Sequence, residues 1–140
     1  MKYSLENNDN KEVAFVFNGD LSLENRKVYT GSDDIIDFGQ GLYGNNMVVM
    51  HNHPRNSSYS TTDLIFFEEN TNVKTLTIVK NNGAVEYLVK TLEFDSEKFK
   101  LEYDRLYKKI VISGTDVEKD KFVQRFLNKT KSGVIWSERK

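Results

Sequence analysis

Apolar runs alternate with polar turns along the chain, and their lengths predict both strands and helices. The run at 12–17 predicts a strand that ends at a turn sequence, residues 18–20, and 21–29 predicts its hairpin partner. Residues 30–46 place isolated apolar positions among Gly, Asn and Asp, which predicts a long connection with at most one short helix. The first third of the chain is therefore expected to contribute two strands and a loop.

The middle of the chain predicts a strand, a helix and a hairpin in that order. The continuous apolar run at 47–50 is typical of a strand buried on both faces. After a polar loop, residues 60–63 have the composition of a helix start, and an apolar helix is predicted over 64–69. The segments 73–79 and 84–89 predict two strands joined by an Asn-Asn-Gly turn.

The last third of the chain is predicted to be mainly helical. Apolar residues recur at helical spacing before and after Gly114, which predicts two helices within about 95–131, and 134–136 predicts a closing strand. No linker or internal repeat interrupts this order. Interleaved strands and helices predict a single α/β domain over 1–140, a mixed β-sheet flanked by helices.

Composition and charge limit the classes of function. The chain has 140 residues and 20 Lys and Arg against 21 Asp and Glu. Such a balance creates no global field for DNA, RNA or an anionic membrane, so neither nucleic acid nor a membrane is expected as a partner. The absence of Cys excludes disulfides, thiolate zinc sites and a cysteine nucleophile. With no signal-peptide pattern and no long apolar run, we expect a cytoplasmic protein.

The two histidines of the chain, His51 and His53, stand together at the end of a predicted buried strand. Side chains two residues apart in a strand project to the same face, with Cα atoms roughly 6.5–7 Å apart, so both imidazoles can reach one metal ion. With no Cys and no other His, a third protein ligand must be Asp or Glu. Asp63, in the first turn of the next predicted helix, is the near candidate. Two His and one carboxylate leave a coordination position for water, as in catalytic zinc sites.

Other interpretations of these residues stay open at this stage. Two His in one tripeptide can be a polar strand end. Ser60 and Asp63 match the capping box that begins many helices, and a capping Asp63 would point at the backbone rather than at a metal. A Ser-His-Asp hydrolase using Ser57, Ser58 or Ser60 is also possible, but no nucleophile elbow is present and one His would be left without a role.

The segment 51–63, an HxHP followed after six residues by SxxD, resembles the JAMM (MPN-type) zinc metalloprotease signature. The residues of the HxHP part are most similar to those of the bacterial RadC-like branch and of similar phage-associated domains. This resemblance implies a cytidine-deaminase-like α/β fold over a core of about 12–90, with 95–131 as a helical extension. The chain departs from the family in having six rather than seven residues between the second His and the Ser.

The resemblance also implies roles for four residues of the motif. His51, His53 and Asp63 would bind Zn²⁺. Ser60 would donate to the oxyanion that forms when an amide carbonyl is attacked. The implied reaction is hydrolysis of an amide bond through a metal-activated water.

The resemblance further implies a glutamate on an upstream strand as the general base. Glu12, at the head of the first predicted strand, is the best match, and Glu6 and Glu24 are rivals. The implied activity is that of a zinc metallopeptidase or isopeptidase, with a protein or peptide substrate that includes ubiquitin-like conjugates. The alternative is a non-catalytic RadC-like or phage-associated module that keeps the fold for binding or assembly.

Overall fold

The computed structural model describes residues 13–17, 27–30, 46–53, 56–112 and 121–139. In this part of the chain six strands form one mixed sheet in the order β2-β1-β3-β4-β5-β6. The strands are β1 (Val13–Phe17), β2 (Lys27–Thr30), β3 (Met47–His53), β4 (Val73–Lys80), β5 (Val85–Lys90) and β6 (Val134–Arg139). The helices are α2 (Thr61–Glu69), α3 (Ser96–Tyr107), which continues into a π-helical turn (Lys108–Ile112), and α5 (Phe122–Lys129).

The predicted α/β class with a mixed, helix-flanked sheet is confirmed. The expected hairpin partner of β1 is present but covers 27–30 rather than 21–29, and residues 18–26 lie outside the described part. The strand predicted at 47–50 continues through His53, and the closing strand predicted at 134–136 continues to Arg139. Both extensions contain polar side chains, which end an apolar run without ending a hydrogen-bond ladder.

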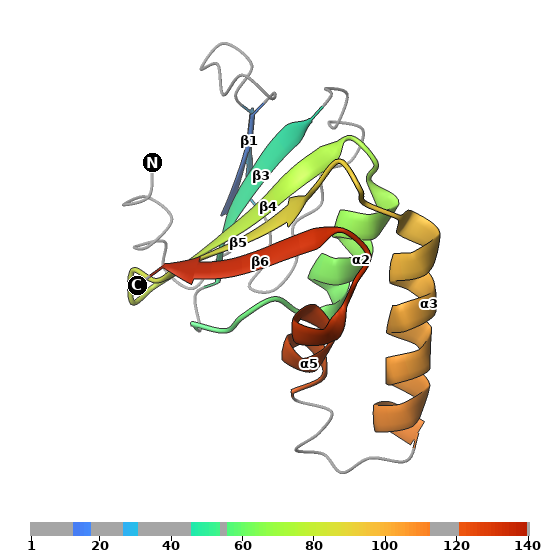
Figure 1. Cartoon of the computed structure of the whole chain (residues 1–140). Coiled ribbons are helices and arrows are strands. Elements are labelled where there is room, and N and C mark those ends of the chain that lie inside the picture. Colours follow the sequence, from blue (N-terminus) through green and yellow to red (C-terminus); the bar gives the residue numbers. More distant parts are fainter. Residues whose placement is uncertain (1–12, 18–26, 31–45, 54–55, 113–120, 140) are drawn as a thin grey trace.

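The three α-helices lie on the same side of the sheet (Figure 1). Alternate residues of each strand therefore face them, and Val49, Leu76 and Leu88 are fully or almost fully buried against Leu64 and Phe67 of α2. A smaller apolar cluster, around Phe15, Val79 and Val85, covers the opposite face. β3 was expected to be buried on both faces. Its helix-facing residues are buried, whereas on the opposite face Val48 and Met50 are half-buried and Asn52 is fully buried.

The C-terminal helices belong to the same core as α2. Phe99 of α3 and Phe126 of α5 meet with ring centroids 4.9 Å apart, in an edge-to-face arrangement typical of aromatic pairs. Both rings are buried together with Leu64 and Phe67. β6 follows α5 and pairs with β5. The segment 95–131, predicted as a helical extension, therefore packs into the core of the domain and leads into a strand of the same sheet.

The segment β3–α2–β4 is a βαβ unit and contains the predicted site. β3 and β4 are parallel, and α2 connects them across the helix-covered face of the sheet. In such a unit the carboxyl end of the first strand lies close to the start of the helix that follows. The structure therefore brings the HxH end of β3 and the SxxD start of α2 together.

Candidate metal centre

His51 and His53 are the last two residues of β3 on the face that α2 covers, and both are paired with β4. His51 pairs with Ala14 of β1 and with Ile78 of β4, and His53 pairs with Lys80. The two side chains are 7% and 6% exposed and project to the same face of the strand, as the alternation of side chains requires. Their backbone is thus fixed before any ligand binds.

α2 begins with the capping box that the sequence predicted. Ser60 has extended backbone angles (φ −94°, ψ 170°), its Oγ accepts from the Asp63 backbone N–H at 3.2 Å, and its own N–H donates to Asp63 Oδ2 at 2.8 Å. These two bonds satisfy donors at the helix start that would otherwise have no partner. The capping interpretation of this motif is therefore correct.

The same Asp63 carboxylate also faces both imidazoles. Asp63 Oδ1 lies 3.3 Å from His51 Nε2, and Asp63 Oδ2 lies 3.3 Å from His53 Nε2. The expectation that a capping Asp63 would point away from a metal is wrong. A carboxylate has two oxygens with about four acceptor sites, so one backbone bond leaves room for contacts to the two rings.

The three donor groups lie close enough together to share one metal ion. Two ligands about 2.0–2.1 Å from a tetrahedral ion are themselves about 3.3 Å apart. The two Nε2 atoms are 3.0 Å apart, and each faces a different oxygen of the Asp63 carboxylate at 3.3 Å. Among the described residues, these three form the cluster of His and acidic side chains close enough to share an ion. Two nitrogens and an oxygen are a donor set that zinc accepts.

His53 presents its lone pair to this site. Its Nδ1 lies 2.9 Å from the backbone carbonyl oxygen of Ser57 and 3.1 Å from Ser57 Oγ. A carbonyl oxygen only accepts, so Nδ1 carries the hydrogen and Nε2 of the neutral ring does not. A metal-binding histidine is commonly oriented by such a bond from its second nitrogen.

The two imidazole rings lie close enough together to share one positive charge. The two Nε2 atoms are 3.0 Å apart, so either a proton or a metal cation must lie between them. Burial raises the pKa of Asp63, but the charges and hydrogen bonds of His51 and His53 outweigh burial and hold it well below its usual range. The carboxylate is ionised at neutral pH, which is the form that binds metal.

Of the remaining predicted site residues, Ser60 lies beside Asp63 and the glutamates lie outside the described part of the chain. Ser60 is exposed beside Asp63, and its hydroxyl hydrogen remains free to be donated because Oγ acts as the acceptor in the capping bond. Glu12, and its rivals Glu6 and Glu24, lie outside the described residues. The one-residue-shorter spacing of the motif does not separate its parts, since Asp63 reaches both imidazoles.

Sequence reasoning missed the residues that hold the loop between the two halves of the motif. Ser57 orients His53, while Ser58 and Tyr59 form hydrogen bonds with Glu86 of β5. One signal was available for Glu86. It is the acidic residue at the centre of the apolar strand 84–89, on the face shared with Ala84 and Leu88, where a strand with that alternation buries its side chains.

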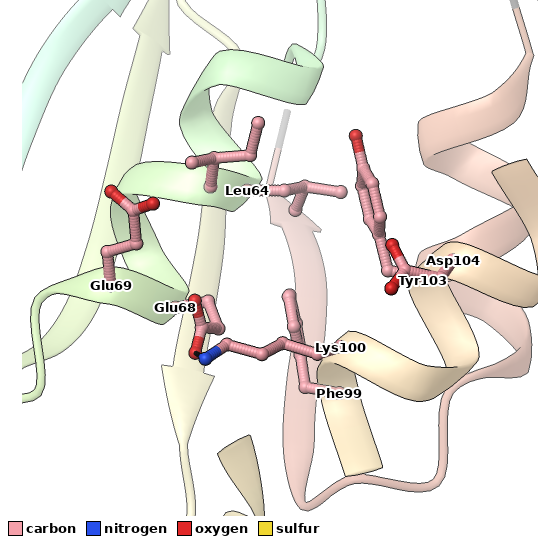
Figure 2. Close-up of a pocket in the computed structure, with 8 residues that line it drawn as sticks. Leu64, Glu68, Glu69, Phe99, Lys100, Tyr103 and Asp104 are labelled. Carbon is pink, nitrogen blue, oxygen red and sulfur yellow. Dashed lines mark ion pairs between the residues drawn. The ribbon is translucent and has the colours of Figure 1, made fainter. Parts of the chain in front are cut away.

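A separate cavity of about 300 Å³ opens between α2 and α3 (Figure 2). Leu64, Phe99 and Tyr103 form its apolar walls, and Glu68 and Lys100 form an ion pair at 3.3 Å beside it. None of the three candidate metal ligands lines this cavity, so it is distinct from the metal centre.

Comparisons with protein-family models, curated proteins and solved structures give no match to this chain. In the part of the chain that the structure describes, the helices are too short or too polar to cross a membrane.

Zinc is expected to stabilise the protein against heat. A ligand that binds only the folded state at 100 times its dissociation constant adds about 2.7 kcal/mol to the free energy of unfolding. For a domain of this size that corresponds to a rise in Tm of roughly 5–10 °C. Differential scanning fluorimetry of the metal-stripped protein measures this shift. Magnesium is the control because it prefers all-oxygen sites, and an equal shift with magnesium, or none with zinc, contradicts the assignment.

Proposed function

We propose that the protein is a zinc-dependent metallopeptidase or isopeptidase of the JAMM type. The observation that supports it best is the convergence of His51, His53 and Asp63, from two separate elements, at distances that suit one tetrahedral ion. The order of β1, β3, α2 and β4 around this point is compatible with the cytidine-deaminase-like fold that the motif implies. Three protein ligands and an open fourth position are characteristic of catalytic rather than structural zinc.

In this proposal some residues of the motif bind the metal, and Ser60 stabilises the negative charge that develops on the substrate carbonyl oxygen. When bound, zinc supplies an acidified water molecule and polarises the substrate carbonyl. His51 and His53 provide neutral nitrogen ligands, and Asp63 provides the negative charge. The Ser60 hydroxyl, next to Asp63 and exposed, is placed to donate to the carbonyl oxygen as negative charge develops there. A protein or peptide amide, including an isopeptide bond to a ubiquitin-like protein, is the proposed substrate.

A carboxylate must serve as the general base in this scheme. Both histidines of the chain are committed to the metal, so neither imidazole is available for proton transfer. We assign the base to Glu12, which stands two residues before Ala14 in the sequence. The assignment rests on the resemblance of the motif, since Glu12 lies outside the described residues. β1 begins at the next residue and pairs through Ala14 with His51.

Chelator-sensitive hydrolysis tests the proposed function. The purified protein is assayed against internally quenched peptides and against ubiquitin linked to a lysine peptide through an isopeptide bond. We expect cleavage that 1,10-phenanthroline abolishes and added zinc restores. Cleavage that survives the chelator would exclude a metal mechanism. Bound zinc without cleavage of either substrate class would instead favour the binding or assembly module.

A further inference from the structure

The segment 56–60, called here the site loop, joins the two halves of the metal centre. It follows His53 closely and ends at Ser60, the N-cap of the helix that carries Asp63. Its conformation therefore decides how far the Asp63 carboxylate lies from the imidazoles. Asn56 has a positive φ of 59°, which Asn tolerates better than most residues, and its Oδ1 accepts from the Asn82 backbone N–H at 2.8 Å.

Two consecutive residues at the middle of the site loop are bound to Glu86 of β5. Ser58 Oγ donates to Glu86 Oε1 at 2.7 Å, and the single Tyr59 hydroxyl hydrogen is shared between the Leu76 carbonyl oxygen and the Glu86 backbone oxygen, the latter at 3.0 Å. Tyr59 is almost completely buried, so the loop is pinned to the sheet rather than lying free in solvent. Glu86 holds this loop with both its side chain and its backbone.

The Glu86 carboxylate is fully buried and has other partners besides the loop. Trp136 Nε1 of β6 donates to the same Oε1 at 2.7 Å, and Lys80 Nζ lies 2.9 Å from Oε2 in a buried ion pair. Ion pairs of this kind contribute little net stability, because apolar residues of similar volume stabilise a core about as well. Stability alone therefore gives weak reason for an acid at the centre of this strand.

The sheet register explains how Glu86 can serve the metal centre without touching it. His51 pairs with Ile78, and Ile78 pairs with Glu86, so His51 and Glu86 lie in one row, two strands apart, on the same face. The site loop crosses this face between them. We propose that Glu86 is a positioning residue: by binding Ser58 it fixes the site loop, and through the loop it sets the position of Asp63 relative to the two imidazoles. This inference rests on the proposed metal centre, not on catalysis.

Two variants that each remove one hydrogen bond from the same carboxylate oxygen test this inference. Ser58→Ala breaks the bond to the site loop, and Trp136→Phe breaks the bond to β6, while Lys80 remains paired with Glu86 in both. Zinc affinity is measured by competition with a chromophoric chelator, and thermal unfolding is followed in parallel. We expect Ser58→Ala to weaken zinc binding roughly tenfold, in the range for residues that orient metal ligands. Trp136→Phe should lower Tm by at least as much as Ser58→Ala does, and should leave the zinc affinity within about twofold of the wild type.

The outcomes separate this inference from the proposed function. Equal losses of affinity in the two variants would mean that Glu86 acts only through general stability, and an unchanged affinity in Ser58→Ala would also overturn the positioning role. A wild-type protein that binds no zinc would overturn both the metal centre and this inference. Zinc binding without hydrolysis would contradict the enzyme alone, because the chelator competition does not depend on activity.

Discussion

Replacing Asp63 with asparagine is expected to weaken zinc binding by about 100-fold or more while the protein still folds. The side chain is one of three protein donors and the sole negative charge among them, and losing a ligand costs more than losing a residue that merely orients one. Asparagine keeps an oxygen that can accept from the Ser60 backbone N–H, as Asp63 Oδ2 does at 2.8 Å. The variant therefore removes the ligand and spares the helix cap.

The matched control for this variant is Glu69→Gln, which removes one negative charge from the other end of the same helix, where the side chain is exposed. Chelator competition should find Glu69→Gln indistinguishable from the wild type. If Asp63→Asn bound zinc within about threefold of the wild type, Asp63 would be a cap and nothing more. The metal centre would then have to be rebuilt around a different carboxylate.

The same variant predicts a dependence of stability on pH in the metal-free protein. The pKa of Asp63 is held below its usual range, so its ionised form stabilises the folded state at any pH above the ordinary carboxyl range. That contribution is lost as the pH falls below about 4, because the unfolded chain then takes up the proton first. Chemical denaturation should show the wild type more stable than Asp63→Asn at pH 7. The difference should shrink as the pH falls below about 4, and a constant difference through that range would contradict the lowered pKa of Asp63.

The convergence of the three candidate metal ligands was predictable because local rules determine their geometry. Alternation along a strand places His51 and His53 on one face, and the short return from strand to helix brings the start of α2 beside them. The relation between capping and ligation was not predictable. A spacing of three residues fits a capping box whether or not the second oxygen of Asp63 faces a ring, and only the direction of α2 relative to β3 decides it.

The support around the site depends on contacts between residues far apart in the sequence. Glu86 stands 28 residues after Ser58 and 50 before Trp136, and no local pattern links them. The integration of the C-terminal helices has the same origin. The helical periodicity of these segments is visible in the sequence. The packing of Phe99 and Phe126 with Phe67, in contrast, depends on the chain returning to the sheet as β6 beside β5.

Replacing Glu12 with glutamine is expected to lower kcat by roughly 100- to 10,000-fold on any substrate that the protein hydrolyses, the range for loss of a positioned general base. Zinc affinity should not change, because Glu12 is assigned to proton transfer and not to coordination. KM should change little for the same reason, since glutamine keeps the size and polarity of the side chain. Steady-state kinetics and chelator competition on one preparation measure all three quantities.

Glu6→Gln and Glu24→Gln are the controls, because these are the other glutamates that precede the HxH motif. Each removes the same charge and should leave kcat within about twofold of the wild type. A large loss in either one, with Glu12→Gln active, would move the base to that residue and leave the metal centre intact. A loss of zinc affinity in Glu12→Gln would be a different result, since it would make Glu12 a fourth ligand. The site would then be closed, and closed four-ligand zinc sites are structural rather than catalytic.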